Sequence, residues 1–244
     1  MLKKLSSILL ILIMITVITA CGSSNETVQN DTPEETEVTE AKSGGWELYD
    51  NEANVLPDTV QEAFDKAVEK YTGSELKPVA YVASQVVAGT NYMILCEAAT
   101  TTETPSVSYQ MVVVYADLQG NAEITQVNEF DLTAYTEGGS SEISTEQLAG
   151  GWQIAEDRSS AVIPQEAKDV FDKAAADLDG NELEPMVLLG TQLVAGKNYA
   201  FFCFSTLQTE ETIHGAQVVI VYEDLEGNAE ITNISTIDPA DYNQ

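Results

Sequence analysis

Few side chains in this sequence have the chemistry that catalysis needs. His214 is the single histidine among the 244 residues. Serine and cysteine nucleophiles are usually activated by a histidine base, and many metal sites use histidine ligands. We therefore expect no enzyme activity, no bound metal and no cofactor. His214 remains a candidate pH-sensitive group.

The three cysteines also argue against a nucleophile or a disulfide framework. Cys96 and Cys203 lie in apolar stretches at matching places in the two halves of the chain, so each half has one unpaired thiol. Free cysteines in such surroundings are usually buried core residues. The third, Cys21, follows a different kind of segment.

The N-terminus has the pattern of a secretory signal. Lys3 and Lys4 precede an almost wholly apolar run, 9–17, and Thr19-Ala20 precede Cys21. The run is shorter than the roughly 20 residues of a comfortable membrane span. The site resembles a bacterial lipobox, which implies a signal peptide over 1–20 and lipidation of Cys21. We therefore expect a protein anchored by lipid to the bacterial cell membrane and facing outside the cytoplasm.

Charge excludes further classes of partner. The chain has 40 acidic residues against 10 basic ones, a net charge of −30. Nucleic acids are bound through Lys and Arg on phosphates, so we expect no nucleic-acid partner. The same charge opposes electrostatic binding to an anionic membrane. Residues 21–43, polar and acidic, predict a disordered tether.

Beyond the tether the sequence repeats itself. Gln85-Val86-Val87-Ala88-Gly89 returns 107 positions later as Gln192-Leu193-Val194-Ala195-Gly196, and Phe64-Asp65-Lys66-Ala67 returns as Phe171-Asp172-Lys173-Ala174. Such self-similarity indicates a duplicated unit. The segment between the copies contains Gly138-Gly139-Ser140-Ser141. We predict one domain over 44–135, a flexible linker over 136–149 and a second domain over 150–244.

Each copy is expected to contain one helix followed by strands. Val60, Phe64 and Ala67 recur at helical spacing, with Pro57 before them and Gly73 after them. Four β-rich stretches follow, separated by short breaks: 79–87, 92–98, 108–116 and 122–130. Trp46-Glu47-Leu48-Tyr49 adds a possible first strand. The pattern predicts an α+β class, an antiparallel sheet of four to five strands wrapped around one helix.

The hairpin after the first long strand would carry apolar residues at its tip. Val87 and Ala88 stand where turns normally use Gly, Asn, Asp or Pro. In one interpretation the valines simply end the strand. In the other, the tip is an apolar wedge that docks in a partner's cleft. The second hairpin, around Asp117-Leu118-Gln119-Gly120-Asn121, has turn residues but lacks the alternating oxygen ligands of a calcium loop.

These residues resemble those of a known family. Gln85 to Gly89 is similar to the Gln-x-Val-x-Gly signature of the cystatins, especially the disulfide-free stefin branch. The likeness includes Gly44-Gly45, the helix and the second hairpin, and copy two shows the same set. It covers nearly all of the chain beyond the tether. The resemblance implies two tandem cystatin-like domains.

It also implies reversible inhibition of papain-like cysteine peptidases, with the active-site cleft occluded by an N-terminal Gly segment and two hairpin loops. The residues that the resemblance assigns to these loops are Gly44, Gly45, Gln85, Val86, Val87, Ala88, Gly89, Leu118 and Gly120 in copy one, and Gly150, Gly151, Gln192, Leu193, Val194, Ala195, Gly196, Leu225 and Gly227 in copy two.

A second hypothesis remains open. Gln119 and Glu226 occupy the second loop, where cystatins carry proline, and the tether and the duplication also suit adhesion. The alternative is a non-inhibitory binding or adhesion module of the same fold at the cell surface. Neither hypothesis fixes the oligomeric state.

Overall fold

The computed structural model describes residues 44–49, 56–101, 106–135, 151–154, 163–176, 178, 180–208 and 212–242. All of them belong to one compact unit, Glu40–Gln244. The predicted signal peptide, Cys21, the tether, the linker 136–149 and Gly150 lie outside the described residues. In the described part of the chain, no helix has the length and apolarity needed to cross a membrane.

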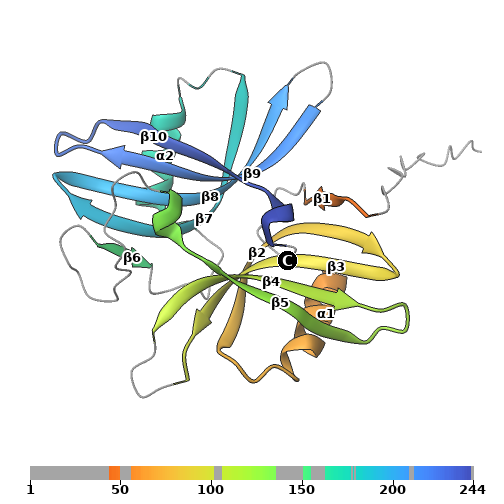
Figure 1. Ribbon diagram of the computed structural model, residues 1–244. Helices are drawn as coiled ribbons and strands as arrows, with labels where there is room; N and C mark the ends of the chain where they lie inside the picture. The colour runs from red at the N-terminus through yellow and green to blue at the C-terminus, as the bar shows by residue number, and fades with distance from the viewer. Residues whose placement is uncertain are drawn as a thin grey trace, which may run out of the picture. The chain divides into compact units, whose positions relative to one another are not determined.

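Both repeats contain the predicted order of elements: a strand, a helix and four further strands, here followed by a short 3-10 helix (Figure 1). The elements of the first repeat are β1 (Trp46–Leu48), α1 (Asp58–Val68), β2 (Glu75–Val87), β3 (Gly89–Ala99), β4 (Val107–Ala116), β5 (Ala122–Phe130) and η1 (Leu132–Tyr135). Those of the second are β6 (Trp152–Ile154), α2 (Gln165–Ala175), β7 (Asn181–Val194), β8 (Gly196–Gln208), β9 (Thr212–Glu223), β10 (Ala229–Ile237) and η2 (Pro239–Tyr242).

Each repeat forms one five-stranded antiparallel sheet whose strands lie side by side in chain order, β1 to β5 and β6 to β10. The β2–β3 hairpin closes with Val87 paired with Gly89, and the β7–β8 hairpin closes with Val194 paired with Gly196. Consecutive long strands joined by tight hairpins fix the register, so each hairpin tip has a definite place at one end of its sheet.

One face of each sheet is covered by the helix of the same repeat. Val60, Phe64 and Ala67 of α1 are buried against Ile94 and Cys96 of β3. In the second repeat α2 packs in the same way over β8 and β9. Pro57 stands directly before α1, where its missing N–H costs nothing because the first helical N–H groups have no partner within the helix.

The other face of each sheet belongs to a core that both repeats share. Met93, Leu95 and Met111 of the first sheet are fully buried in one hydrophobic cluster with Phe202 and Val218 of the second. Neighbouring strand residues point to opposite faces, so Leu95 enters this shared core while Ile94 faces the helix. The central strands of each sheet, such as β3 and β4, are therefore buried on both faces, whereas β5 and β10 keep exposed residues.

The predicted fold class is wrong. We expected α+β, cystatin-like domains in which an antiparallel sheet wraps around one helix. The described part of the chain is instead dominated by two five-stranded antiparallel sheets and contains only two α-helices, of 11 residues each. Runs such as Met111–Val114 are apolar at every position, which is typical of strands buried on both faces. The prediction gave each sheet one buried face and so missed the shared core.

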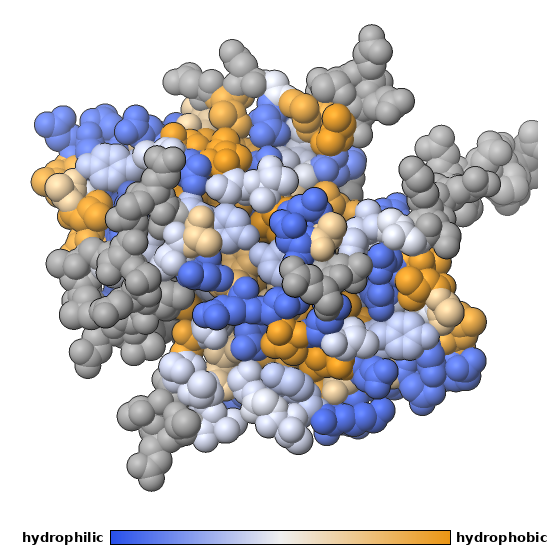
Figure 2. Space-filling model, in the orientation of Figure 1, coloured by the Kyte–Doolittle hydropathy of each residue, from blue (hydrophilic) through white to orange (hydrophobic). Residues whose placement is uncertain are grey.

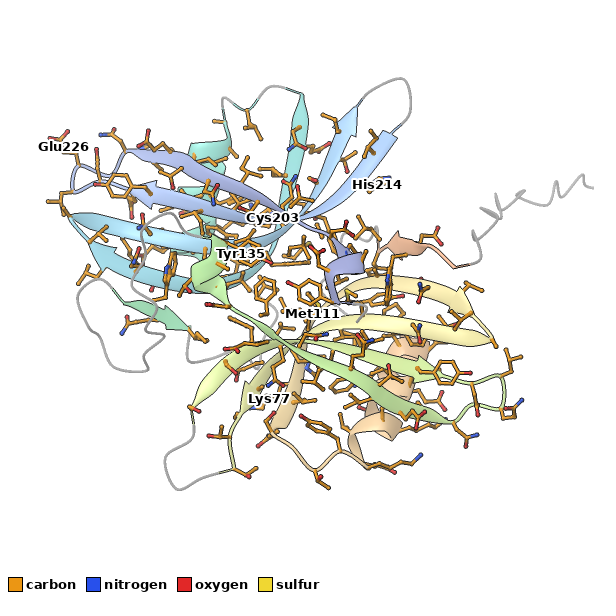
Figure 3. All side chains as sticks on the ribbon, in the orientation of Figure 1. Lys77, Met111, Tyr135, Cys203, His214 and Glu226 are labelled. Carbon is orange, nitrogen blue, oxygen red and sulfur yellow. The ribbon has the colours of Figure 1, made fainter. Side chains whose placement is uncertain are left out.

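Polar contacts between the repeats are partly reciprocal. Asn128 on β5 donates a hydrogen bond to the carbonyl oxygen of Tyr242, and Asn233 on β10 donates one to that of Tyr135. The hydroxyls of Tyr135 and Tyr242 lie 3.0 Å apart, although the residues are 107 positions apart in sequence. Figure 3 labels Tyr135 and Met111 where the two sheets meet. Such mutual contacts are typical of copies related by an approximate two-fold axis.

Candidate functional site

The first repeat brings three separate segments together at one end of its sheet. Thr90, just after the β2–β3 tip, pairs with Ala116, just before the β4–β5 loop. The backbone N–H of Gly44 donates to the carbonyl oxygen of Val86 over 3.0 Å. The β2–β3 tip therefore lies between the Gly segment on one side and the start of the β4–β5 loop on the other. We name the exposed residues at this end of the sheet loop edge 1: Gly44, Gly45, Val86, Val87, Ala88, Leu118 and Gly120.

The β2–β3 tip is held against β4 by close backbone packing. Gly89 has φ +145°, and a Cβ atom there would overlap the carbonyl oxygen of Ala116 and lie 2.8 Å from the Tyr115 ring. Glycine is therefore required at this position. The Tyr115 hydroxyl donates to the carbonyl oxygen of Ala88 over 2.7 Å. These contacts fix the tip that carries Val87.

The β4–β5 loop is shaped by one carboxylate. Asp117 accepts hydrogen bonds from the backbone N–H groups of Gln119 (2.9 Å) and Asn121 (2.8 Å), and from the Asn121 amide. These bonds, with that from the Asn121 side chain the strongest, hold the pKa of Asp117 below its ordinary value. Gly120 has φ +82° and completes the turn. The loop thereby presents Leu118 to solvent.

Loop edge 1 exposes apolar surface. Val87 is 41% exposed and Leu118 82%, and Val86 is also exposed. Figure 2 shows hydrophobic side chains at this end of the first sheet, with hydrophilic ones between and beside them. Exposed valine and leucine at hairpin tips are unusual, because turns favour polar residues and glycine. Burying such side chains against a partner contributes roughly 25 cal/mol per Å² of apolar area.

The glutamine of the predicted loop motif has a structural role that sequence reasoning missed. Gln85 is 8% exposed. Its side-chain amide donates to the carbonyl oxygen of Gly44 over 3.1 Å and its oxygen accepts from Asn91 over 2.8 Å. Gln192 accepts from Asn198 in the same way, over 2.7 Å. The sequence signal for this hydrogen-bonded pair is a Gln followed six residues later by an Asn, which is present in both repeats. Gln85, Gln192, Gly89 and Gly196 are buried, so they hold the edges rather than offer contacts.

The second repeat builds the same edge. Gly196 has φ +132°, and a Cβ there would overlap the carbonyl oxygen of Glu223. The Tyr222 hydroxyl donates to the carbonyl oxygen of Ala195 over 2.6 Å. Val194 is 42% exposed and Leu225 86%. We give the name loop edge 2 to the residues at this tip and in its neighbouring loop: Leu193, Val194, Ala195, Leu225 and Gly227. All of them are exposed except Gly227, which is half-buried.

Two features distinguish loop edge 2. Gly151 is buried, unlike Gly44 and Gly45, and Gly150 lies outside the described residues. No Gly segment is therefore available beside the second pair of loops among the residues that the structure describes. The other difference is charge.

Charged groups surround loop edge 2. The Tyr199 hydroxyl donates to Glu223 over 3.0 Å and to Glu166 over 3.3 Å. Lys197 forms an ion pair with Glu166 over 3.3 Å. Burial first, and then the two carboxylates, raise the pKa of Tyr199. Glu226 lies at the tip of the neighbouring loop (Figure 3). At the matching places the first repeat carries uncharged residues: Thr59, Thr90, Ala116 and Gln119.

The groups with catalytic potential lie elsewhere. Cys96 and Cys203 are free and fully buried, and burial raises the pKa of both thiols. His214 is exposed on β9, with Nδ1 3.4 Å from the Thr206 hydroxyl. Among the described residues, no group of three or more His, Cys, Asp or Glu side chains is arranged to hold a metal ion.

No protein-family model matches this chain, and a search of curated proteins finds no significant match.

Proposed function

We propose that this chain is a reversible inhibitor of papain-like cysteine peptidases, and that loop edge 1 occludes their active-site cleft. The observation that carries the proposal is the convergence of Gly44, Val87 and Leu118, from three separate segments, on one end of a sheet. Three apolar or glycine-bearing points in a row suit insertion into a groove. A partner with a flat surface would gain nothing from loops that project in this way.

The loops are held before any partner arrives, which favours tight binding. Tyr115 holds the first tip, Gln85 holds the Gly segment and Asp117 holds the second loop. Ordering loops on binding costs free energy, so loops that are already fixed lose less of it. Gly44 has open space where a Cβ would stand, which permits close backbone approach to a cleft wall.

The tip is also unsuited to cleavage. Val87 pairs with Gly89, so the chain reverses direction at once and presents a closed hairpin. A hairpin tip differs from the extended peptide that a peptidase holds across its catalytic centre. Loop edge 1 would therefore block the cleft and remain intact. The lipid anchor on Cys21 that the sequence predicts would place the inhibitor outside the cytoplasm of a bacterium, where it meets peptidases from its surroundings.

The test is inhibition of papain by residues 40–244, followed through turnover of a fluorogenic substrate. We expect reversible inhibition, and we expect the double variant Val87→Asp, Leu118→Asp to weaken it by about 100-fold or more. Charged side chains there would be desolvated in an apolar cleft, and central apolar anchors commonly contribute 2 kcal/mol or more. The matched control is Ile213→Asp, which places the same charge on another exposed apolar residue of β9.

A folded chain that leaves papain unaffected would contradict this proposal. The charged surroundings of loop edge 2 favour the second candidate in that case, a non-inhibitory binding or adhesion module that holds another surface protein through the same edges. Pull-down of a partner that loop-edge variants no longer bind, with papain uninhibited throughout, would support it.

A further inference from the structure

We infer that one chain binds two peptidase molecules at the same time, one at each loop edge. This inference rests on the proposed function and deepens it, because inhibition by loop edge 1 alone would satisfy that proposal. Three observations carry it: the likeness of the two edges, their separation, and the shared core that fixes the separation.

Loop edge 2 presents its apolar side chains as loop edge 1 does. Tyr222 holds Ala195 as Tyr115 holds Ala88, over 2.6 and 2.7 Å. Asp224 accepts from the backbone N–H groups of Glu226 and Asn228, both over 2.8 Å, and from the Asn228 amide. A lysine on each helix, Lys66 or Lys173, donates to the carbonyl oxygen of the glycine in the same loop. The two hairpin loops of loop edge 2 are therefore held in the same way as those of loop edge 1, and they can contact a partner without a Gly segment beside them.

The edges face away from each other. On β5, Asn128 contacts the other repeat. Ala122, where β5 begins beside the β4–β5 loop, is six residues from Asn128, which is about 20 Å at 3.3 Å per residue. On β10, Asn233 contacts the first repeat. Ala229, where β10 begins beside the β9–β10 loop, is four residues from Asn233, which is about 13 Å at the same rise. Within the compact unit, Figure 1 shows the β4–β5 and β9–β10 loops at opposite ends. The loops are therefore about 30 Å or more apart.

This spacing leaves room for two globular partners. A peptidase of about 200 residues has a radius of about 20 Å, and docking at opposite ends directs the two molecules away from each other. Binding at one edge then does not obstruct the other.

The shared core makes the spacing rigid. Leu95 and Met111 of the first sheet are packed with Phe202 of the second, all fully buried. The Tyr109 hydroxyl donates to the carbonyl oxygen of Leu189 over 2.8 Å between the repeats. Two units joined by a flexible linker alone would move independently, whereas these two are held in one geometry.

Charge selects the partner of the second edge. Four acidic residues lie there against two lysines, Lys173 and Lys197, so a cleft with a basic rim is complementary to this edge. The acidic residues are Glu166, Glu223, Asp224 and Glu226. The expected partner of loop edge 2 is thus a second papain-like peptidase molecule with cationic groups beside its cleft. The two edges are expected to bind with unequal affinity.

The test measures the mass of the complex between residues 40–244 and excess papain by light scattering during gel filtration. We expect two papain molecules per chain. The double variant Val194→Asp, Leu225→Asp should retain one, as should Val87→Asp, Leu118→Asp, and all four substitutions together should abolish binding. Ile213→Asp should still bind two, and circular dichroism should show each variant folded.

The outcomes separate the two proposals. A complex of one papain with one wild-type chain, lost in the loop edge 1 variant alone, would overturn the inference and leave the proposed function standing. Absence of any complex would overturn both. Two bound papain molecules that persist in the loop edge 2 variant would also overturn the inference, because the second molecule would then occupy another surface.

Discussion

Loop edges 1 and 2 are held by the same contacts and surrounded by different charges. Each has a glycine packed under the next strand, a tyrosine that holds the tip and an aspartate that shapes the second loop. Around them, uncharged residues such as Thr90 and Ala116 in one repeat become Lys197 and Glu223 in the other. The presentation of the tips is therefore common to both copies, while the groups that would face a partner differ.

The repeats also differ where they pack together. Leu95 and Phe202 occupy matching places in the shared core, as do Tyr109 and Ala216. Because the two sheets contribute unequal side chains to one cluster, each repeat completes the core of the other. This predicts that damage to the core of one repeat weakens the second repeat as well.

The largest effect is expected from Phe202→Ala. Removing a fully buried phenylalanine should lower the free energy of unfolding by about 3–5 kcal/mol. Because Phe202 packs with residues of the first repeat, amide hydrogen exchange should accelerate in β3 and β4 as well as in β8. Mass spectrometry of exchanged peptides from the two repeats measures this.

Phe201→Ala is the matched control. Phe201 is the neighbouring residue, is equally buried and packs on the helix side, in a cluster built from the second repeat alone. It should cost a similar free energy, with the fastest exchange confined to α2 and its sheet. Unchanged exchange in β3 and β4 of the Phe202→Ala variant would show that the two repeats are not coupled.

Local elements were predictable because their signals are local. Pro57 and the spacing of Val60, Phe64 and Ala67 predicted α1, and these three side chains are buried as expected. The helix ends at Val68, five residues before Gly73. Strand β2 begins at Glu75, ahead of the prediction, because a register shift after Pro78 accommodates the proline within the strand.

The fold class was not predictable in the same way, because it depends on what covers the second face of each sheet. A run such as Met111–Val114 indicates burial on both faces but does not identify the covering elements, one of which belongs to the other repeat. The loop edges show the same limit. The sequence located Val87 and Leu118, but the inward orientation of Gln85 depends on its contacts with Gly44 and Asn91.

An intermediate effect is expected from salt. Each edge can be measured alone by using the double Asp variant of the other edge. Raising NaCl from about 0.05 to 0.5 M should weaken papain binding at loop edge 2 about tenfold, because salt screens exposed charges. Binding at loop edge 1 should weaken less than about twofold. Glu226→Gln, which installs the residue found at position 119, should reduce the salt dependence. Glu182→Gln removes the same charge at the far end of β7 and should not change it. Equal salt dependence at both edges would show that charge does not distinguish their binding to papain.

The smallest effect concerns pH, and here the two repeats should behave alike. Hydrogen bonds from Asn121 to Asp117, and from Asn228 to Asp224, lower the pKa of each carboxyl from an ordinary 3.8. A lowered folded pKa means that the stabilisation is complete above pH 3.8 and is lost as the pH falls through the folded value. The NMR signals of the Asn121 and Asn228 side-chain amides should therefore stay constant from pH 7 to 4 and shift together below it. Asp117→Asn should abolish the shift at Asn121 while leaving that at Asn228, and a shift at only one amide in the unmodified chain would show that the two loops are not held alike.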